Sequence, residues 1–293
     1  MPSSATDADP AEKRTAKPGF CGIWGLPYID LAPLFDTAPL AEVDAEVCLG
    51  LSRVATSYTG GSLKWMGVVA PHVQGDGYVD FMHVIEGFSR DEFAAFVSLS
   101  DAPGNFDLDR HAEVRFGDET DHPLTKRQML YLKYRYGVYF PWKVAYHLLD
   151  NVWWEDKNLG AGKAFHREAC EVFPRTLGFI RALPFREIGR VVLFGLEAND
   201  HAPLHRDTLP GSRDDVQHSV TLCPRGNKRF YLADPDLTTR LPVTSPLYWF
   251  NDMDWHGVEP DPYFRYSIRI DGVFEPGFVR DLQRYAARKT RTA

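Results

Sequence analysis

After Pro184 the sequence becomes a succession of short strand-like runs, and no other feature limits the possible folds as strongly. Turn-forming stretches such as Pro210-Gly211 and Asp234-Pro235-Asp236 separate these runs. Short strands at this spacing are typical of a double-sheet jelly roll. The expected strands are Glu187–Glu197, His201–Asp207, Val216–Cys223, Arg229–Ala233, Thr238–Val243, Pro246–Phe250, Asp254–Glu259 and Phe264–Phe274.

The half of the chain before these strands has mainly helical patterns. Apolar spacing or capping residues predict helices at Pro39–Ala55, Arg90–Leu99, Thr125–Tyr136 and Lys163–Ala182. Pro174 must kink or divide the last of these helices. Two further segments, Tyr58–Ala70 and Gly77–Ile85, have compositions closer to strands, and Gly277–Arg288 is expected to be a closing amphipathic helix.

Together these patterns predict an α+β protein whose core is a double-stranded β-helix, or jelly roll. We expect a disordered tail at residues 1–18, an α-rich region packed on the core at 19–185, and the core with its closing helix at 186–293. The tail mixes small, polar and charged residues without an apolar segment, so it does not resemble a signal peptide.

Composition excludes some classes of partner. The chain has 40 acidic and 33 basic residues and a formal charge of −7, opposite to the footprint of a nucleic-acid-binding protein. No apolar stretch approaches the roughly 20 residues that span a membrane. The 4 cysteines are scattered, which favours a reducing cytoplasm over a disulfide scaffold. We therefore expect a cytoplasmic protein with a small-molecule partner; the oligomeric state is left open.

One tripeptide, His205-Arg206-Asp207, has the spacing of a metal-binding pair, because residues i and i+2 of a strand point to the same face. Such tripeptides also arise by chance. A second histidine, His256, follows inside Trp255-His256-Gly257-Val258, far enough along to return across a jelly roll. Two imidazoles and one carboxylate form the facial triad that is typical of oxygen-activating Fe(II), with coordination positions left for other ligands.

An anion-binding group is expected beside this triad. Arg265 and Ser267 share one face of the last strand, and a guanidinium with a neighbouring hydroxyl suits a carboxylate. Arg269 has the same parity and is the main rival of Arg265 for this role.

With these residues in place, the sequence from Glu187 to Pro276 resembles the Fe(II)/2-oxoglutarate-dependent dioxygenases. The residues from Trp249 to Asp271 look most like the aspartyl/asparaginyl β-hydroxylase branch. The resemblance implies that His256 is a metal ligand, that Arg265 holds 2-oxoglutarate, and that His218 contacts the same co-substrate. That branch can lack the carboxylate ligand, whereas Asp207 supplies one here, as in most hydroxylases of the wider superfamily.

The expected function is therefore hydroxylation of an unactivated C–H bond of a small molecule, such as an amino acid or a natural-product intermediate. The resemblance implies Fe(II), 2-oxoglutarate and dioxygen as cofactor and co-substrates, and succinate and CO2 as products. A divalent-metal hydrolase or lyase on the same fold is one alternative, and a non-catalytic jelly-roll binding protein is another. Trp153-Trp154-Glu155-Asp156 fits a substrate lid and a core edge equally well.

Overall fold

A computed structural model of the chain describes residues 19–57, 81–116, 122–138, 140, 144–151 and 155–292. The strands in these ranges are β1 (Tyr28–Asp30), β2 (Val144–His147), β3 (Phe185–Leu196), β4 (Ala202–His205), β5 (Ser219–Leu222), β6 (Phe230–Ala233), β7 (Arg240–Pro242), β8 (Leu247–Phe250), β9 (Trp255–Val258) and β10 (Arg265–Phe274). The α-helices are α1 (Leu40–Leu51), α2 (Met82–Glu86), α3 (Arg90–Val97), α4 (Lys126–Tyr136), α5 (Arg167–Val172), α6 (Pro174–Arg181) and α7 (Pro276–Thr292). Short 3-10 helices lie at Ala32–Leu34, Pro103–Asn105 and Leu108–Glu113.

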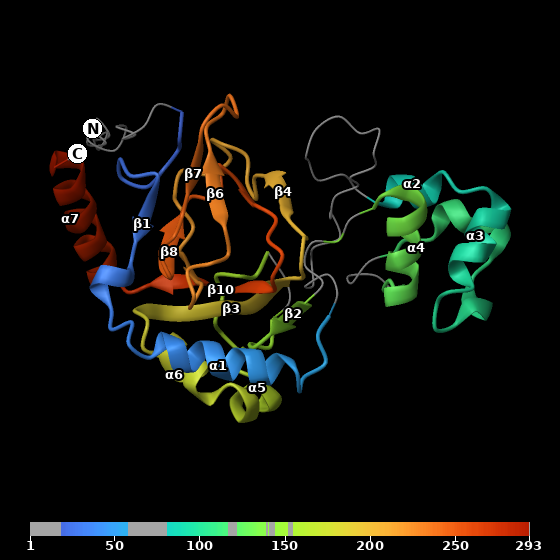
Figure 1. The fold of residues 1–293 in the computed structure, drawn as a ribbon, viewed down its shortest axis with the longest axis horizontal. Coiled ribbons are helices and arrows are strands. Elements are labelled where there is room, and N and C mark those ends of the chain that lie inside the picture. The colour runs from blue at the N-terminus through green and yellow to red at the C-terminus, as the bar shows by residue number, and fades with distance from the viewer. Residues whose placement is uncertain are drawn as a thin grey trace, which may run out of the picture.

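The strands form two antiparallel sheets. The larger sheet has six strands in the order β1-β8-β5-β10-β3-β2, and the smaller has four in the order β4-β9-β6-β7. In Figure 1, β4, β6 and β7 stand above the long β3 and β10. From β3 to β10 consecutive strands alternate between the two sheets, except for β6 and β7, which are neighbours in the smaller sheet. Residues far apart in sequence therefore meet in the space between the sheets.

The face of the larger sheet that is turned away from the smaller sheet packs against helices. Apolar residues at alternate positions of the central strands, such as Leu193 on β3 and Ile268 on β10, share a buried cluster with α1 and α6 residues, including Val47 and Leu177. Figure 1 shows α1, α5 and α6 beneath β3. This packing fixes which face of each strand is apolar and leaves the intervening residues pointing to the smaller sheet.

The face turned toward the smaller sheet is partly polar, although it is buried. On β10, Ile268 and Ile270 point toward the helices. The alternate residues Ser267, Arg269 and Asp271 therefore point into the space between the sheets, where they are buried. Arg190 of β3 is opposite Asp271 in the register. Because buried charges are costly unless they are paired, a polar interior of this kind points to a functional site.

The expected helices and strands are largely confirmed, with an α+β composition. Each of the eight strands expected after Pro184 overlaps an observed strand, and β3 begins two residues earlier than expected, at Phe185. Ser89 and Thr125 form capping boxes with Glu92 and Gln128 at the starts of α3 and α4. Pro174 begins α6 and divides the expected helix into α5 and α6. The closing helix is α7.

One expected strand is wrong. Within Gly77–Ile85, the described residues from Met82 onward form the short helix α2, not a strand. Short apolar pairs such as Phe81-Met82 and Val84-Ile85 do not distinguish a buried strand from a buried helix, and Ile85 is buried in the helical arrangement. Tyr58–Ala70, the expected tail at residues 1–18, and Trp153-Trp154 lie outside the described residues.

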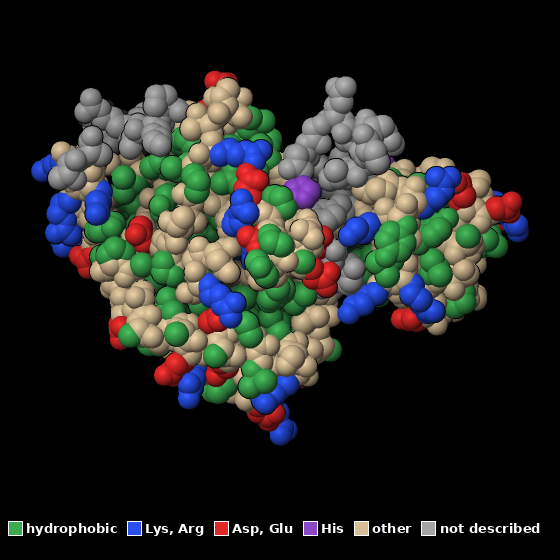
Figure 2. Space-filling model, in the orientation of Figure 1, with side chains coloured by type: hydrophobic (Ala, Val, Ile, Leu, Met, Phe, Trp, Pro, Cys, Tyr) green, Lys and Arg blue, Asp and Glu red, His purple; other side chains and the backbone are tan. Residues whose placement is uncertain are grey.

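Within the described part of the chain, every helix is too short or too polar to cross a lipid bilayer. Lys and Arg side chains are interspersed with Asp and Glu over the face drawn in Figure 2.

The region expected at 19–185 contributes β1 and β2 to the ends of the larger sheet, and β3 begins at Phe185.

Candidate metal centre

His205 and His256 are brought together by sheet pairing. His205 is the last residue of β4, His256 lies in β9, and the two residues are directly opposite each other in the antiparallel register. Their ring centroids are 4.2 Å apart. His256 also packs against the rings of Phe230 and Phe250 at 5.8 and 4.9 Å. The two imidazoles therefore project from neighbouring strands to one point between the sheets.

Asp207 completes the cluster, but not from the strand on which it was expected. β4 ends at His205, and Asp207 lies in a bend two residues later. The amide groups of Asp207 and Thr208 donate to the Asp252 carbonyl at 3.0 and 3.3 Å, which holds this bend. The expectation that Asp207 lies beside His205 is therefore correct, but strand alternation is not the reason. The bend after β4 turns the Asp207 carboxylate back toward His205.

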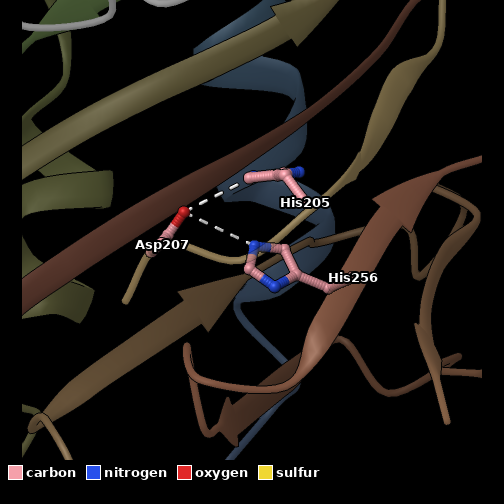
Figure 3. Close-up of side chains that lie close together, drawn as sticks. All are labelled: His205, Asp207 and His256. Carbon is pink, nitrogen blue, oxygen red and sulfur yellow. Dashed lines mark ion pairs between the residues drawn. The ribbon is translucent and has the colours of Figure 1, made fainter. Parts of the chain in front are cut away.

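The three side chains have the geometry of a metal site (Figure 3). Asp207 Oδ1 lies 3.4 Å from His205 Nε2 and 3.6 Å from His256 Nε2. One ligand atom from each residue lies within 4.8 Å of the other two. Two imidazole nitrogens and a carboxylate oxygen at these separations suit a first-row divalent cation and leave other coordination positions open.

Backbone carbonyls orient both imidazoles. His205 Nδ1 lies 2.7 Å from the Pro203 carbonyl and His256 Nδ1 lies 2.9 Å from the Asp254 carbonyl. A carbonyl only accepts, so each Nδ1 must carry the hydrogen, and each Nε2 presents its lone pair to Asp207. Such contacts fix the tautomer and the ring orientation of metal-binding histidines.

The electrostatics of the cluster favour the protonation states that a metal needs. Burial, with the neighbouring His256, lowers the pKa of His205, which keeps the imidazole neutral. Burial alone would raise the pKa of Asp207, but the adjacent His256, His205 and Arg269 hold it well below its ordinary value. The site therefore offers a neutral imidazole at His205 and an ionised carboxylate at Asp207 near neutral pH.

Arg269 connects the cluster to a buried charge network. Its Nη1 lies 3.1 Å from Asp207 Oδ2, and its Nε donates to Asp271 Oδ1 at 2.9 Å. Asp271 also pairs with Arg190 at 3.2 Å and accepts from Gln217 at 2.9 Å. Arg269 is 7% exposed and Asp271 and Arg190 are fully buried, so solvent screens these interactions little.

A second buried cation, Lys228, lies close to Arg269. Its ammonium donates to Ser267 Oγ on β10. Burial lowers the pKa of Lys228 to about 7, and the nearby Arg265 and Arg269 act in the same direction. Ser267 thus lies next to a cation, and the space beside the triad holds more positive charge than the sequence motif alone suggested.

Arg265 has a different environment from the one expected for a co-substrate anchor. Its Nη1 donates to the carbonyls of Asp261 and Tyr263 at 3.1 and 3.0 Å, and its Nη2 to those of Asp200 and Glu259 at 2.8 and 3.1 Å. These carbonyls belong to the β3–β4 and β9–β10 connections. Arg265 therefore joins two irregular segments through hydrogen bonds to the backbone.

His218 is also placed away from the triad. Its ring stacks on Phe274 at 4.7 Å and meets Trp249 edge-on at 5.9 Å, and its Nδ1 accepts from the Phe274 amide at 3.0 Å. Phe274 and Trp249 belong to the cluster that faces the helices. The structure therefore brings together His205, Asp207 and His256, puts Ser267 and Arg269 nearby, and turns His218 to the other face of the larger sheet.

Two lysines near the site had no signal in the sequence. Lys157 reaches the interior because the backbone of its segment crosses β3 at Gly189, where a Cβ would lie 2.2 Å from the Lys157 carbonyl oxygen. Its ammonium lies 3.7 Å from Asp252, and burial, with Arg269 nearby, lowers its pKa to about 7. Lys157 and Lys228 are single residues in irregular segments, so no spacing rule singles them out.

Comparisons with known proteins add distant structural likenesses. No family model matches the chain, and no curated protein matches it. EvdMO1 is 18% identical at a TM-score of 0.24, over 28% of this chain and 26% of EvdMO1. A 2OG-Fe(II) oxygenase family oxidoreductase from Burkholderia pseudomallei is 12% identical at a TM-score of 0.28, over 44% of this chain and 70% of that one.

A Pseudomonas putida prolyl-4-hydroxylase is 14% identical at a TM-score of 0.26, over 45% of this chain and 72% of that one. The chain thus spans about a quarter of EvdMO1 and nearly three quarters of the two oxygenases. These likenesses are too distant to carry an argument about activity, which must come from the geometry of the metal centre.

Proposed function

We propose that this chain is an Fe(II)- and 2-oxoglutarate-dependent oxygenase that hydroxylates an unactivated C–H bond of a small molecule. The observation that carries the proposal is the convergence of His205, Asp207 and His256 on one point between two sheets. The strand order β8-β5-β10-β3 opposite β4-β9-β6-β7 supports a double-stranded β-helix, in which such a triad lies inside the barrel.

The residues present fit Fe(II). The donors are the Nε2 atoms of two imidazoles and an ionised carboxylate, the set that oxygen-activating ferrous sites use. Iron bound there would supply the activation of dioxygen. The protein's part is to hold these ligands, to bind the co-substrate and substrate beside them, and to exclude competing reactions.

We infer that Arg269, rather than Arg265, provides the main positive charge for 2-oxoglutarate. Arg269 lies against the metal ligand Asp207, whereas both Nη atoms of Arg265 donate to backbone carbonyls. Lys228 and Ser267 add an ammonium and a hydroxyl close to Arg269. A dianion that bridges the iron and this cationic group would satisfy charges that are costly to bury alone.

The proposed substrate class is a small molecule, such as an amino acid or a natural-product intermediate. The net negative charge and the mixed surface charges in Figure 2 support a partner other than nucleic acid. All four cysteines are free thiols, which supports a cytoplasmic location. The aspartyl/asparaginyl β-hydroxylase branch stays a prediction from the sequence resemblance.

The test of this function is conversion of 2-oxoglutarate to succinate by the purified protein. We expect succinate formation that requires both Fe(II) and dioxygen, with faster turnover when a true substrate is present. Zn²⁺ in place of Fe(II) should abolish it, because zinc has no redox chemistry. Hydrolysis of a substrate by the zinc form, without consumption of 2-oxoglutarate, would point to a hydrolase instead.

Replacement of Asp207 by glycine should separate metal binding from catalysis. The change removes one negative charge and one ligand but leaves both histidines, which are held by Pro203 and Asp254. We expect Asp207→Gly to retain weakened divalent-metal binding and to lose Fe(II)-dependent succinate formation. The check is metal titration beside the succinate assay; undiminished succinate formation would show that Asp207 is not a ligand.

Binding of 2-oxoglutarate should weaken as pH rises above 7. Lys228 has a pKa of about 7 and is next to Arg265, Arg269 and Cys223, so it loses its charge through this range. An anion favours protonated Lys228, so binding takes up a proton, and affinity should fall by up to about tenfold per pH unit. His205 is already neutral there, because its pKa is lowered.

The measurement is calorimetric titration of 2-oxoglutarate between pH 6 and 9 in buffers of different ionisation enthalpy. Lys228→Met should bind more weakly at pH 6 and show a shallower pH dependence. Lys157 also has a pKa of about 7, which is why the variant, rather than the wild-type profile alone, identifies the titrating group. An unchanged slope in Lys228→Met would exclude Lys228 from the anion site.

A further inference from the structure

The connection between β8 and β9, Asn251-Asp252-Met253-Asp254, is a buried and mainly polar turn next to the metal centre. The exposed fractions of its four residues range from 2 to 7%. The turn is closed internally, since the Asp254 amide donates to the Asn251 carbonyl at 3.0 Å and the Met253 amide to Asn251 Oδ1 at 3.1 Å. A buried polar turn must have its hydrogen bonds satisfied by specific partners.

Two of the three proposed ligands are held by the backbone of this turn. The Asp252 carbonyl accepts from the Asp207 and Thr208 amides, and the Asp254 carbonyl accepts from His256 Nδ1. The two carbonyls are two residues apart, so a shift of the turn displaces Asp207 and the His256 ring together. The separation of these ligands is therefore set by one short segment.

The side chains of the turn attach it to three other parts of the chain. The Asp252 carboxylate pairs with Arg213, lies 3.7 Å from Lys157 Nζ, and accepts from Thr208 Oγ1 at 3.4 Å. Asp252 thus places one negative charge between two cations. The Asp252 and Lys157 side chains are buried, and the Arg213 side chain is 23% exposed.

On the other side, the turn is tied to the beginning of the described chain. The Asp254 carboxylate accepts from the amides of Cys21 and Gly22 at 2.6 and 2.8 Å. The Asn251 side-chain amide donates to the Gly22 carbonyl at 3.0 Å. These contacts join residues more than 200 positions apart in the sequence. They should keep the turn from rotating relative to β8 and β9.

We propose that Asn251–Asp254 is a shared positioning device for two metal ligands, and that Asp252 is its principal positioning residue. The inference rests on the proposed function in so far as the triad binds a metal. Asparagine at position 252 would keep the shape but leave Lys157 and Arg213 facing a neutral group. Because the loss of a partner is strongly unfavourable for a buried cation such as Lys157, the turn should move and take Asp207 with it.

The experiment is a titration with Co²⁺, whose visible absorption reports coordination geometry. Asp252→Asn should weaken Co²⁺ binding about tenfold to a hundredfold, the range for residues that support metal ligands, and change the absorption band. The matched control is Asp44→Asn, which also removes a buried carboxylate. Asp44 pairs with Arg225 and the Tyr266 hydroxyl, away from the triad, at 2.7 and 2.9 Å. The Asp44→Asn variant should therefore have a lower melting temperature than the wild type and an unchanged Co²⁺ affinity.

Two further variants distinguish positioning from stability. Arg213→Gln alone should weaken Co²⁺ binding less than Asp252→Asn, and it gives a milder test if Asp252→Asn fails to fold. The double variant Asp252→Asn with Arg213→Gln should recover part of the affinity, because it removes both members of the pair. Wild-type affinity and absorption in folded Asp252→Asn, or in Arg213→Gln if Asp252→Asn does not fold, would overturn the proposal. Absence of Co²⁺ binding by the wild type would instead overturn the proposed metal centre.

Discussion

Replacement of His256 by alanine should reduce Fe(II)-dependent succinate formation to background. The change removes one of three ligands, and the Asp254 carbonyl that orients the ring then has no partner. His205→Ala should have the same effect, because its Nε2 faces Asp207 in the same way. Neither change alters the strand pairing of β4 and β9, so the fold should persist.

His218→Ala is the matched control for these histidine variants. His218 contacts Phe274 and Trp249 on the other face of the larger sheet. This variant should lose some stability and keep both metal content and turnover. Measurement of bound iron, melting temperature and succinate formation for the three variants makes the comparison. Wild-type turnover in His205→Ala or His256→Ala would refute the triad, and loss of turnover in folded, iron-loaded His218→Ala would restore its expected contact with the co-substrate.

Replacement of Arg269 by alanine should weaken 2-oxoglutarate binding by at least about a hundredfold. Loss of one member of a buried charge pair costs about 3–5 kcal/mol, and each 1.4 kcal/mol is about tenfold in affinity. Arg269→Lys should recover only part of the affinity, because an ammonium keeps the charge and loses the planar fork that contacts Asp207 and Asp271 together. Anaerobic titration of the Fe(II) protein measures both.

Arg265→Lys is the comparison variant for Arg269→Lys, because it makes the same substitution four positions earlier on the same strand. Lysine does not reproduce the four hydrogen bonds to Asp200, Glu259, Asp261 and Tyr263. We expect a lower melting temperature and nearly unchanged 2-oxoglutarate affinity per folded molecule. If Arg265→Lys loses the affinity and Arg269→Ala keeps it, the anion site is at Arg265, as the sequence resemblance implies.

The sequence predicted the strands well because each strand buries one face against helices or the opposite sheet. The same alternation identified His205 and Asp207, although Asp207 reaches the site through a bend that depends on the Asp252 carbonyl. That bend could not be read from spacing, since its hydrogen-bond acceptor lies 45 residues later in the chain. The motif therefore indicated which residues meet but not what holds them.

The two arginines of β10 show a limit of another kind. Arg265 and Arg269 have the same residue type and the same parity, so strand geometry gives both the same face. They differ in their surroundings: backbone carbonyls of irregular segments surround Arg265, and carboxylates surround Arg269. Carbonyl positions in connections depend on turn geometry that the sequence pattern does not specify.

The most direct test of the proposed function is anaerobic addition of 2-oxoglutarate to the Fe(II) form, followed by visible absorption. Chelation of iron by the 2-oxo acid should produce a charge-transfer band that saturates at one equivalent of 2-oxoglutarate per protein. The band should be absent in His256→Ala and require much higher 2-oxoglutarate concentration in Arg269→Ala. A wild-type protein that binds Fe(II) tightly and gives no band at any 2-oxoglutarate concentration would contradict the proposed co-substrate.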